Sequence, residues 1–272
     1  MIPDNLSILG LDQTGAVNAR NEPKALSAAL LCRNRGNWEL RTGLRLPSLR
    51  RQCVEALVEL EGEVLILVDS VLGLPGSLNV SFSSLLQRAK HFEHGGKPFG
   101  RRTASRFFAS FLDEALAIRL LSGSLPRTQL PSRLAETLAG ANTVFLEHPF
   151  QRNIGCGTFR VLKELASEPR WFDVWPWDTK RQHRFLVAEG YPSLFWKQCL
   201  GARTRNLPTL QRFLEQNYPK AALPRTADEA DAVLLALGGR RCLEEGSFAT
   251  ATLPEIAWRE GWIAGLPCIT AS

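Results

Sequence analysis

The sequence has no apolar run long enough to span a lipid bilayer, and its first residues lack the basic and apolar regions of a secretory signal. We therefore expect a cytoplasmic protein without a membrane partner. The six cysteines include no C-x-x-C pair, which argues against structural zinc and favours reduced, mostly buried thiols. The 272 residues are 44% hydrophobic, which is enough for a sizeable core and excludes a disordered chain.

Several catalytic signatures are missing as well. The sequence has no G-x-S-x-G motif, so a serine hydrolase of that class is unsupported. It has no G-x-x-x-x-G-K-[ST] phosphate-binding loop. Its four histidines follow no strong metal-binding spacing.

Lysine is scarce, although the formal net charge is +6. Only seven of the 33 basic residues are lysines, and the rest are arginines. Arginine binds phosphate through two parallel hydrogen bonds and stacks on bases, so this bias suits a nucleic-acid partner. A genome of high GC content would enrich arginine in the same way. The charge therefore permits a nucleic-acid partner without requiring one.

Apolar segments bounded by turn residues predict five β-strands, at residues 6–12, 25–32, 38–46, 64–69 and 184–189. Three of these strands end in a carboxylate, namely Asp12, Asp69 and Glu189. An amphipathic helix is expected at 48–60, between the third and fourth strands. Such a crossover should return the fourth strand parallel to the first, which would bring Asp12 and Asp69 to one edge of the sheet.

Residues 76–180 interrupt this pattern. Helices are expected there at 83–88, 104–122 and 160–168, joined by connections rich in Gly, Pro and Arg. We therefore predict an α/β fold in which residues 1–272 form a single domain. Its mixed five-stranded sheet is flanked by helices and carries a largely helical insertion at 76–180.

A helix expected at 226–238, with Gly238-Gly239 as its C-terminal stop, supplies two more carboxylates. Asp228 and Asp231 are three residues apart and therefore share a face. Acidic residues are common at helix starts, and this explains Asp228 well. It explains Asp231 less well, because an apolar segment that should be buried follows it directly. A carboxylate in such a place needs a partner, and a metal ion can be that partner.

Five carboxylates therefore form the candidate catalytic set: Asp12, Asp69, Glu189, Asp228 and Asp231. Concentrated negative charge of this kind is plausible mainly when divalent cations neutralise it, and hard oxygen ligands suit Mg²⁺ or Mn²⁺. We expect Asp12, Asp69 and Asp231 as metal ligands, with Asp228 and Glu189 completing or tuning the site. Two such cations about 4 Å apart can assist phosphodiester hydrolysis.

These residues also carry a resemblance to known proteins. The order of the predicted elements is similar to the RNase H-like fold, and the acidic helix resembles the last catalytic helix of RuvC-type Holliday-junction resolvases. Five motifs resemble those of the family called domain of unknown function 429: Gly10-Leu-Asp12, Val68-Asp-Ser-Val-Leu-Gly-Leu-Pro75, Glu189-Gly-Tyr-Pro192, Asp228-Glu-Ala-Asp-Ala232 and Glu260-Gly-Trp-Ile263. The resemblance covers residues 6–263 apart from the insertion. It implies a metal-dependent nuclease with Asp12, Asp69 and either Asp228 or Asp231 as metal ligands.

A basic run in the insertion is the candidate contact for nucleic acid. It contains Lys97, Arg101, Arg102 and Arg106, with phenylalanines interleaved. A solvated loop would have the same composition. Both interpretations stay open.

Two other functions remain as alternatives. The segment Asp12-Gln-Thr14-Gly resembles the first phosphate loop of sugar and acetate kinases, which share the fold but normally duplicate it. A non-catalytic nucleic-acid-binding protein is the other. The sequence leaves the oligomeric state open, with a homodimer as one option.

Overall fold

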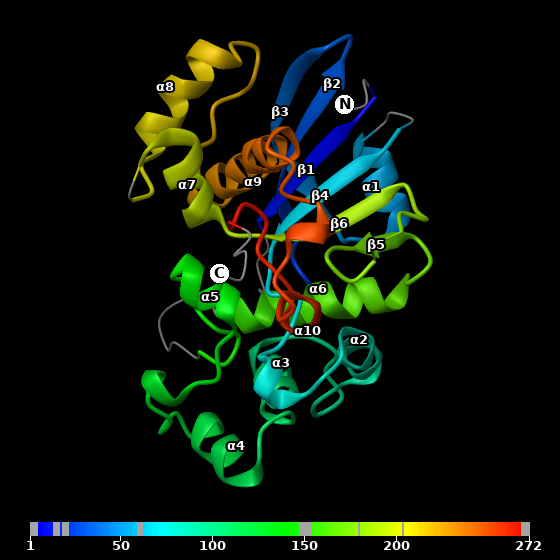
Figure 1. Cartoon of the computed structure of the whole chain (residues 1–272), viewed down its shortest axis with the longest axis vertical. Helices are drawn as coiled ribbons and strands as arrows, with labels where there is room; N and C mark the ends of the chain where they lie inside the picture. Colours follow the sequence, from blue (N-terminus) through cyan, green and yellow to red (C-terminus); the bar gives the residue numbers. More distant parts are fainter. Residues whose placement is uncertain are drawn as a thin grey trace.

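The computed structural model describes residues 5–12, 17, 22–58, 62–146, 154–178, 180–202 and 204–267. Its centre is a six-stranded mixed sheet flanked by helices (Figure 1). The strands are β1 (Ser7–Asp12), β2 (Leu26–Asn34), β3 (Asn37–Leu46), β4 (Val64–Asp69), β5 (Phe172–Val174) and β6 (Phe185–Gly190). They lie in the order β3-β2-β1-β4-β6-β5.

The pairing of the strands confirms the predicted crossover. The first three strands form an antiparallel meander, and β4 returns parallel to β1. β6 is parallel to β4, and β5 is parallel to β6. The predicted number of five strands was one too few, because the short β5 adds an edge strand. This strand lies in an aromatic-rich segment and has only three residues, which is too few for a periodic pattern to reveal it.

Ten helices are assigned within the described residues. They are α1 (Arg51–Val58), α2 (Phe82–His91), α3 (Arg101–Ala109), α4 (Glu114–Leu121), α5 (Leu134–Ala139), α6 (Ile154–Ser167), α7 (Pro192–Leu200), α8 (Leu207–Asn217), α9 (Ala227–Glu244) and α10 (Ala257–Glu260). Short 3₁₀ turns occupy Gly76–Leu78, Arg127–Gln129 and Thr250–Thr252. None of the described helices is both long enough and apolar enough to cross a membrane.

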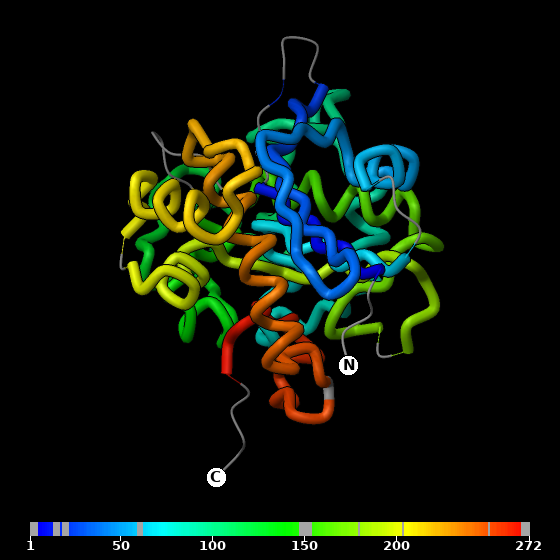
Figure 2. The backbone as a smooth tube through the Cα atoms, turned by 90° about the horizontal axis from the view of Figure 1, so that it is seen from above, coloured from blue at the N-terminus to red at the C-terminus, as the bar shows by residue number. Residues whose placement is uncertain are grey.

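Alternating side chains of the strands build two cores, one on each face of the sheet. On one face, Leu65 and Leu67 of β4 pack with α7, α8 and α9. On the other face, Ile66 and Val68 pack with α1 and α6. The helix α9 crosses the first of these faces, as Figure 2 shows in orange. The sheet is therefore buried on both sides, which explains its continuous apolar strands.

A third hydrophobic cluster lies among α2, α3, α4 and α6. These helices come from the stretch 76–180, and in Figure 1 α2, α3 and α4 lie beyond α6, on its side away from the sheet. The helix predicted at 104–122 is wrong, because two helices, α3 and α4, replace it. The reason is local: the side chain of Asp113 accepts a hydrogen bond from the backbone N–H of Leu116 at 2.9 Å and starts a new helix there.

The helix α9 also departs from prediction, because it runs through Gly238-Gly239 to Glu244. Both glycines are buried, and their role is close packing. A Cβ atom on Gly238 would lie 2.4 Å from the ring of Phe195, and one on Gly239 would lie 2.7 Å from Ile8. The helix therefore approaches the sheet and α7 more closely than side chains would allow.

The cysteines described are all free thiols, as expected. Cys32 and Cys242 are buried, and three others are partly buried. Cys268 lies outside the described residues.

Candidate functional site

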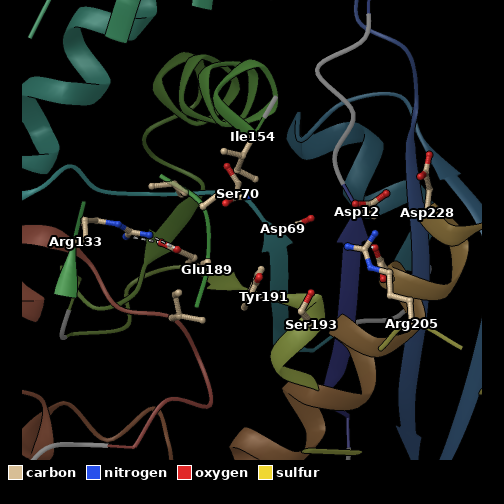
Figure 3. A pocket seen from close by; sticks show the side chains of 16 residues that line it. Asp12, Asp69, Ser70, Arg133, Ile154, Glu189, Tyr191, Ser193, Arg205 and Asp228 are labelled. Carbon is tan, nitrogen blue, oxygen red and sulfur yellow. Dashed lines mark hydrogen bonds and ion pairs between the residues drawn. The ribbon is translucent and has the colours of Figure 1, made fainter. Parts of the chain in front are cut away.

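A cleft of about 310 Å³ opens at the carboxyl ends of β1, β4 and β6 (Figure 3). All five carboxylates predicted from the sequence line it: Asp12, Asp69, Glu189, Asp228 and Asp231. This edge of an open α/β sheet is where such folds bind their ligands. The structure thus gathers side chains that are up to 219 residues apart in the chain (Asp12 to Asp231).

The pleat of the sheet divides these carboxylates into two groups. Val68 of β4 lies opposite Glu189 of β6, and Asp69 lies opposite Gly190. Neighbouring residues of a strand point to opposite faces, so Glu189 shares the face of Val68 and points away from Asp69. Leu11 of β1 packs in the same core as Val68, so the next residue, Asp12, points to the opposite face. Asp12 and Asp69 therefore face α9, and Glu189 does not.

The helix α9 delivers Asp228 and Asp231 to the same side as Asp12. Its approach depends on Gly10 of β1, because a Cβ atom there would lie 2.1 Å from the carbonyl oxygen of Ala232. The side chain of Thr226 accepts a hydrogen bond from the backbone N–H of Glu229 and caps the start of the helix. The first residues of α9 therefore lie at the cleft, which Asp228 and Asp231 line.

Three members of this group have raised pKa values: Asp12, Asp69 and Asp231. Burial, together with repulsion from Asp69, Asp231 and Asp228, raises the pKa of Asp12 to about 9. Burial and the charge of Asp231 raise the pKa of Asp69 to about 7. Burial also raises the pKa of Asp231. In the absence of a cation, the cluster therefore retains protons near neutral pH.

Two other residues hold Asp231 in place. Its Oδ1 accepts a hydrogen bond from the indole Nε1 of Trp196 at 3.0 Å. Its Oδ2 lies 2.8 Å from a guanidinium nitrogen of Arg205. The positive charge of Arg205 favours the ionised forms of Asp12, Asp69 and Asp231 and lowers their pKa values, but it does not offset burial.

Glu189 lies on the other side of the cleft in a fully satisfied network (Figure 3). The buried guanidinium of Arg133 donates to both of its carboxylate oxygens, one of them at 2.8 Å. The backbone N–H of Leu72 also donates to Glu189, at 3.0 Å. Arg133 further donates to Glu136 and to the backbone carbonyl of Glu260. Burial alone would lower the pKa of Arg133, but these carboxylates raise it above its ordinary value.

Within the described part of the chain, no three His, Cys, Asp or Glu side chains form a preformed metal-binding group. The donors themselves still suit a hard divalent cation, because they are carboxyl oxygens and a bound cation would displace the protons that Asp12 and Asp69 retain. Asp12 and Asp69 are the best placed, since they are close enough to share a hydrogen bond and therefore lie within reach of one cation. Asp231 would have to exchange Arg205 for the cation.

The basic residues predicted from the sequence come together away from the acidic cleft. Arg101 and Arg102 line two cavities of about 440 and 450 Å³, one shared with Arg106 and the other with Lys97. All four side chains are exposed. We call Lys97, Arg101, Arg102 and Arg106 the basic surface.

Three important residues of the cleft escaped prediction from the sequence. Arg133 and Arg205 are two among many arginines, and neither lies in a recognisable motif. Trp196 lies in α7, and from the sequence alone it could equally be a core residue without a polar partner. A hint existed only for Asp231, whose position before an apolar segment required a partner.

Comparisons with protein-family models, with curated proteins and with solved structures give no match for this chain. Inferences about its function therefore depend on the chemistry of the cleft itself.

Proposed function

We propose that this protein is a metal-dependent nuclease that hydrolyses phosphodiester bonds of nucleic acid. One observation carries the proposal: Asp12, Asp69, Asp228 and Asp231 line a single cleft, and the first two have raised pKa values. Buried charge of this kind is costly unless a partner neutralises it. A divalent cation is a partner that four carboxylates can accept together.

The topology supports an RNase H-like assignment, which the resemblance to domain of unknown function 429 implies. An antiparallel meander of three strands is followed by α1 and by parallel strands on the other side of β1. In that assignment the acidic helix is α9, which packs against β1 at Gly10.

Asp12 and Asp69 are the first choice for ligands of Mg²⁺ or Mn²⁺, and Asp231 and Asp228 complete the set. A bound cation would act as a Lewis acid on the phosphodiester and stabilise negative charge as the bond breaks. The protein contributes orientation: Trp196 fixes one oxygen of Asp231, and β1 and β4 hold Asp12 and Asp69 side by side. Glu189 orders the opposite wall through Arg133 and Leu72 and is not a ligand in this proposal.

The basic surface would hold the phosphate backbone of the nucleic acid. Val17 lines one of its two cavities and is five residues beyond Asp12. A fully extended chain covers ~3.6 Å per residue, so the Cα atoms of Asp12 and Val17 lie within about 18 Å of each other. That distance corresponds to roughly five base pairs of rise along a duplex. One substrate molecule can therefore contact both regions.

The test is cleavage of labelled single-stranded, duplex, hybrid and branched nucleic acids with Mg²⁺ or Mn²⁺. We expect cleavage of at least one substrate, abolished by EDTA and by Asp69→Asn. Loss of a ligand should exceed the ~10–100-fold effect typical of groups that only orient ligands. Glu215→Gln is the matched control, because Glu215 is exposed on α8 and outside the cleft. Cleavage that persists in Asp69→Asn would contradict the proposal, and nucleic-acid binding without any cleavage would favour a non-catalytic binding protein.

A further inference from the structure

Among the residues that the structure describes, Arg205 is one of two arginines that line the cleft. It precedes Asn206, which caps the start of α8, and its guanidinium lies on the Asp12 side of the cleft (Figure 3). One of its nitrogens is 2.8 Å from Oδ2 of Asp231. The pair is asymmetric: 51% of the Arg205 side chain is exposed, against 3% of the Asp231 side chain.

A second arginine in the same cleft shows what a permanent partner looks like. Arg133 is fully buried and donates hydrogen bonds to Glu136, to Glu189 and to the backbone carbonyl of Glu260. It could not leave without exposing several buried acceptors. Arg205 reaches Asp231 from an exposed position, so its guanidinium is hydrated again when it turns away, and the cost falls on Asp231, which then needs another cation.

Asp231 is built to survive this exchange. Trp196 holds its Oδ1 at 3.0 Å, independently of Arg205. When Arg205 leaves, Oδ2 therefore keeps its place and becomes available to a cation. A divalent ion brings twice the charge of a guanidinium to a site where Asp12 and Asp69 also lie.

We propose that Arg205 is an exchangeable counter-ion of this site: it occupies Asp231 until a divalent cation displaces it, and then binds a phosphate of the substrate. This inference rests on the nuclease function proposed above. The second step follows from chemistry, because a guanidinium at the mouth of the cleft has the planar fork that matches a phosphodiester. Arg205 is thus a competitor for the metal and a positioning residue for the substrate.

The competition is tested by calorimetric titration of Mn²⁺ into the protein without nucleic acid. We expect Arg205→Ala to bind Mn²⁺ more tightly than the wild type, by roughly tenfold for each 1.4 kcal/mol of competition removed. Arg205→Lys should behave more like the wild type. Arg212→Ala, an exposed arginine of α8 outside the cleft, should be unchanged. Thermal unfolding in EDTA verifies that each variant is folded.

Equal or weaker Mn²⁺ binding by a folded Arg205→Ala would overturn the inference and leave the nuclease proposal standing. Absence of Mn²⁺ binding in both the wild type and Arg205→Ala would overturn both. These two failures are therefore distinguishable.

The phosphate contact is tested at saturating Mn²⁺, where competition no longer matters. We expect Arg205→Ala to raise KM for a labelled oligonucleotide by roughly tenfold or more, because a hydrogen bond to a charged group is lost. The kcat value should change much less, and Arg205→Lys should restore part of the KM. An unchanged KM would contradict this second step.

Discussion

The two walls of the cleft treat buried acid in opposite ways. On one wall, Glu189 has both oxygens bonded to Arg133, and a backbone N–H adds a third contact. On the other wall, Asp12 and Asp69 face each other with raised pKa values. A buried carboxylate whose oxygens are fully hydrogen-bonded and paired with a cation stabilises the fold. A buried pair of carboxyl groups without such partners is favoured only with a proton or another ligand. The contrast supports the metal site that we propose on the second wall.

The largest expected effect comes from breaking the satisfied wall. Arg133→Ala should lower the free energy of unfolding by about 3–5 kcal/mol, because it leaves Glu189 buried and unpaired. Arg205→Ala should cost less, because Arg205 is exposed and Asp231 keeps its hydrogen bond to Trp196. Urea unfolding of both variants in EDTA measures the difference. Equal losses would show that the two walls do not differ as described.

A middle-sized effect should appear as a pH dependence of the metal-free protein. The pKa values of Asp12 and Asp69 are raised from 3.8 to about 9 and about 7 in the folded state. The folded protein therefore keeps protons that the unfolded chain releases. The stability from these groups is complete below pH 4 and is lost as the pH rises through about 7 and then about 9.

Asp12→Asn removes the ionisation of Asp12 and isolates its part of this effect. In EDTA at pH 8.5 the variant should be more stable than the wild type by on the order of 1–3 kcal/mol, because the wild-type Asp12 must take up a proton to fold at that pH and Asn need not. The advantage should vanish at pH 4, and Mn²⁺ should shrink it by stabilising only the wild type. Urea unfolding between pH 4 and 9 provides the measurement. A variant less stable than the wild type at pH 8.5 would contradict the raised pKa of Asp12 in the folded protein.

The smallest effect concerns the basic surface, which extends the contrast to the substrate. Arg101→Ala combined with Arg102→Ala should weaken binding of a labelled oligonucleotide by about two- to tenfold, similarly for all sequences. The slope of log K against log salt concentration should become shallower by about one unit for each arginine removed, because each arginine accounts for about one phosphate contact. Fluorescence anisotropy in metal-free buffer measures both. Arg212→Ala is the control, and an equal loss in that variant would mean that the charge acts without a defined site.

Much of the cleft could be predicted from the sequence because it depends on local patterns. Asp12 and Asp69 end apolar strands, and the spacing of Asp228 and Asp231 marks one face of a helix. Their convergence follows from the right-handed crossover and the sheet edge. The helix α9 is longer than predicted, because Gly238-Gly239 serves close packing, and only the neighbouring Phe195 and Ile8 make this visible.

The division between the two walls could not be predicted. It depends on the register of β4 against β6, since a shift by one residue would turn Glu189 toward Asp69. It also depends on Arg133, which is 56 residues away from Glu189 along the chain and joins it only through the packing of α5. Contacts of this kind arise from tertiary structure, and no local pattern encodes them. For the kinase alternative, residues 13–15 of the segment Asp12-Gln-Thr14-Gly lie outside the described residues.

Anomalous scattering from crystals soaked in Mn²⁺ at pH 7.5 most directly tests whether Asp12 and Asp69 bind a metal ion. We predict a manganese peak bonded to Asp12 and Asp69, with Asp231 turned from Arg205 to the metal and with Glu189 still paired to Arg133. A cleft without a manganese peak, in which Arg205 still holds Asp231, would contradict a metal-dependent site in this protein.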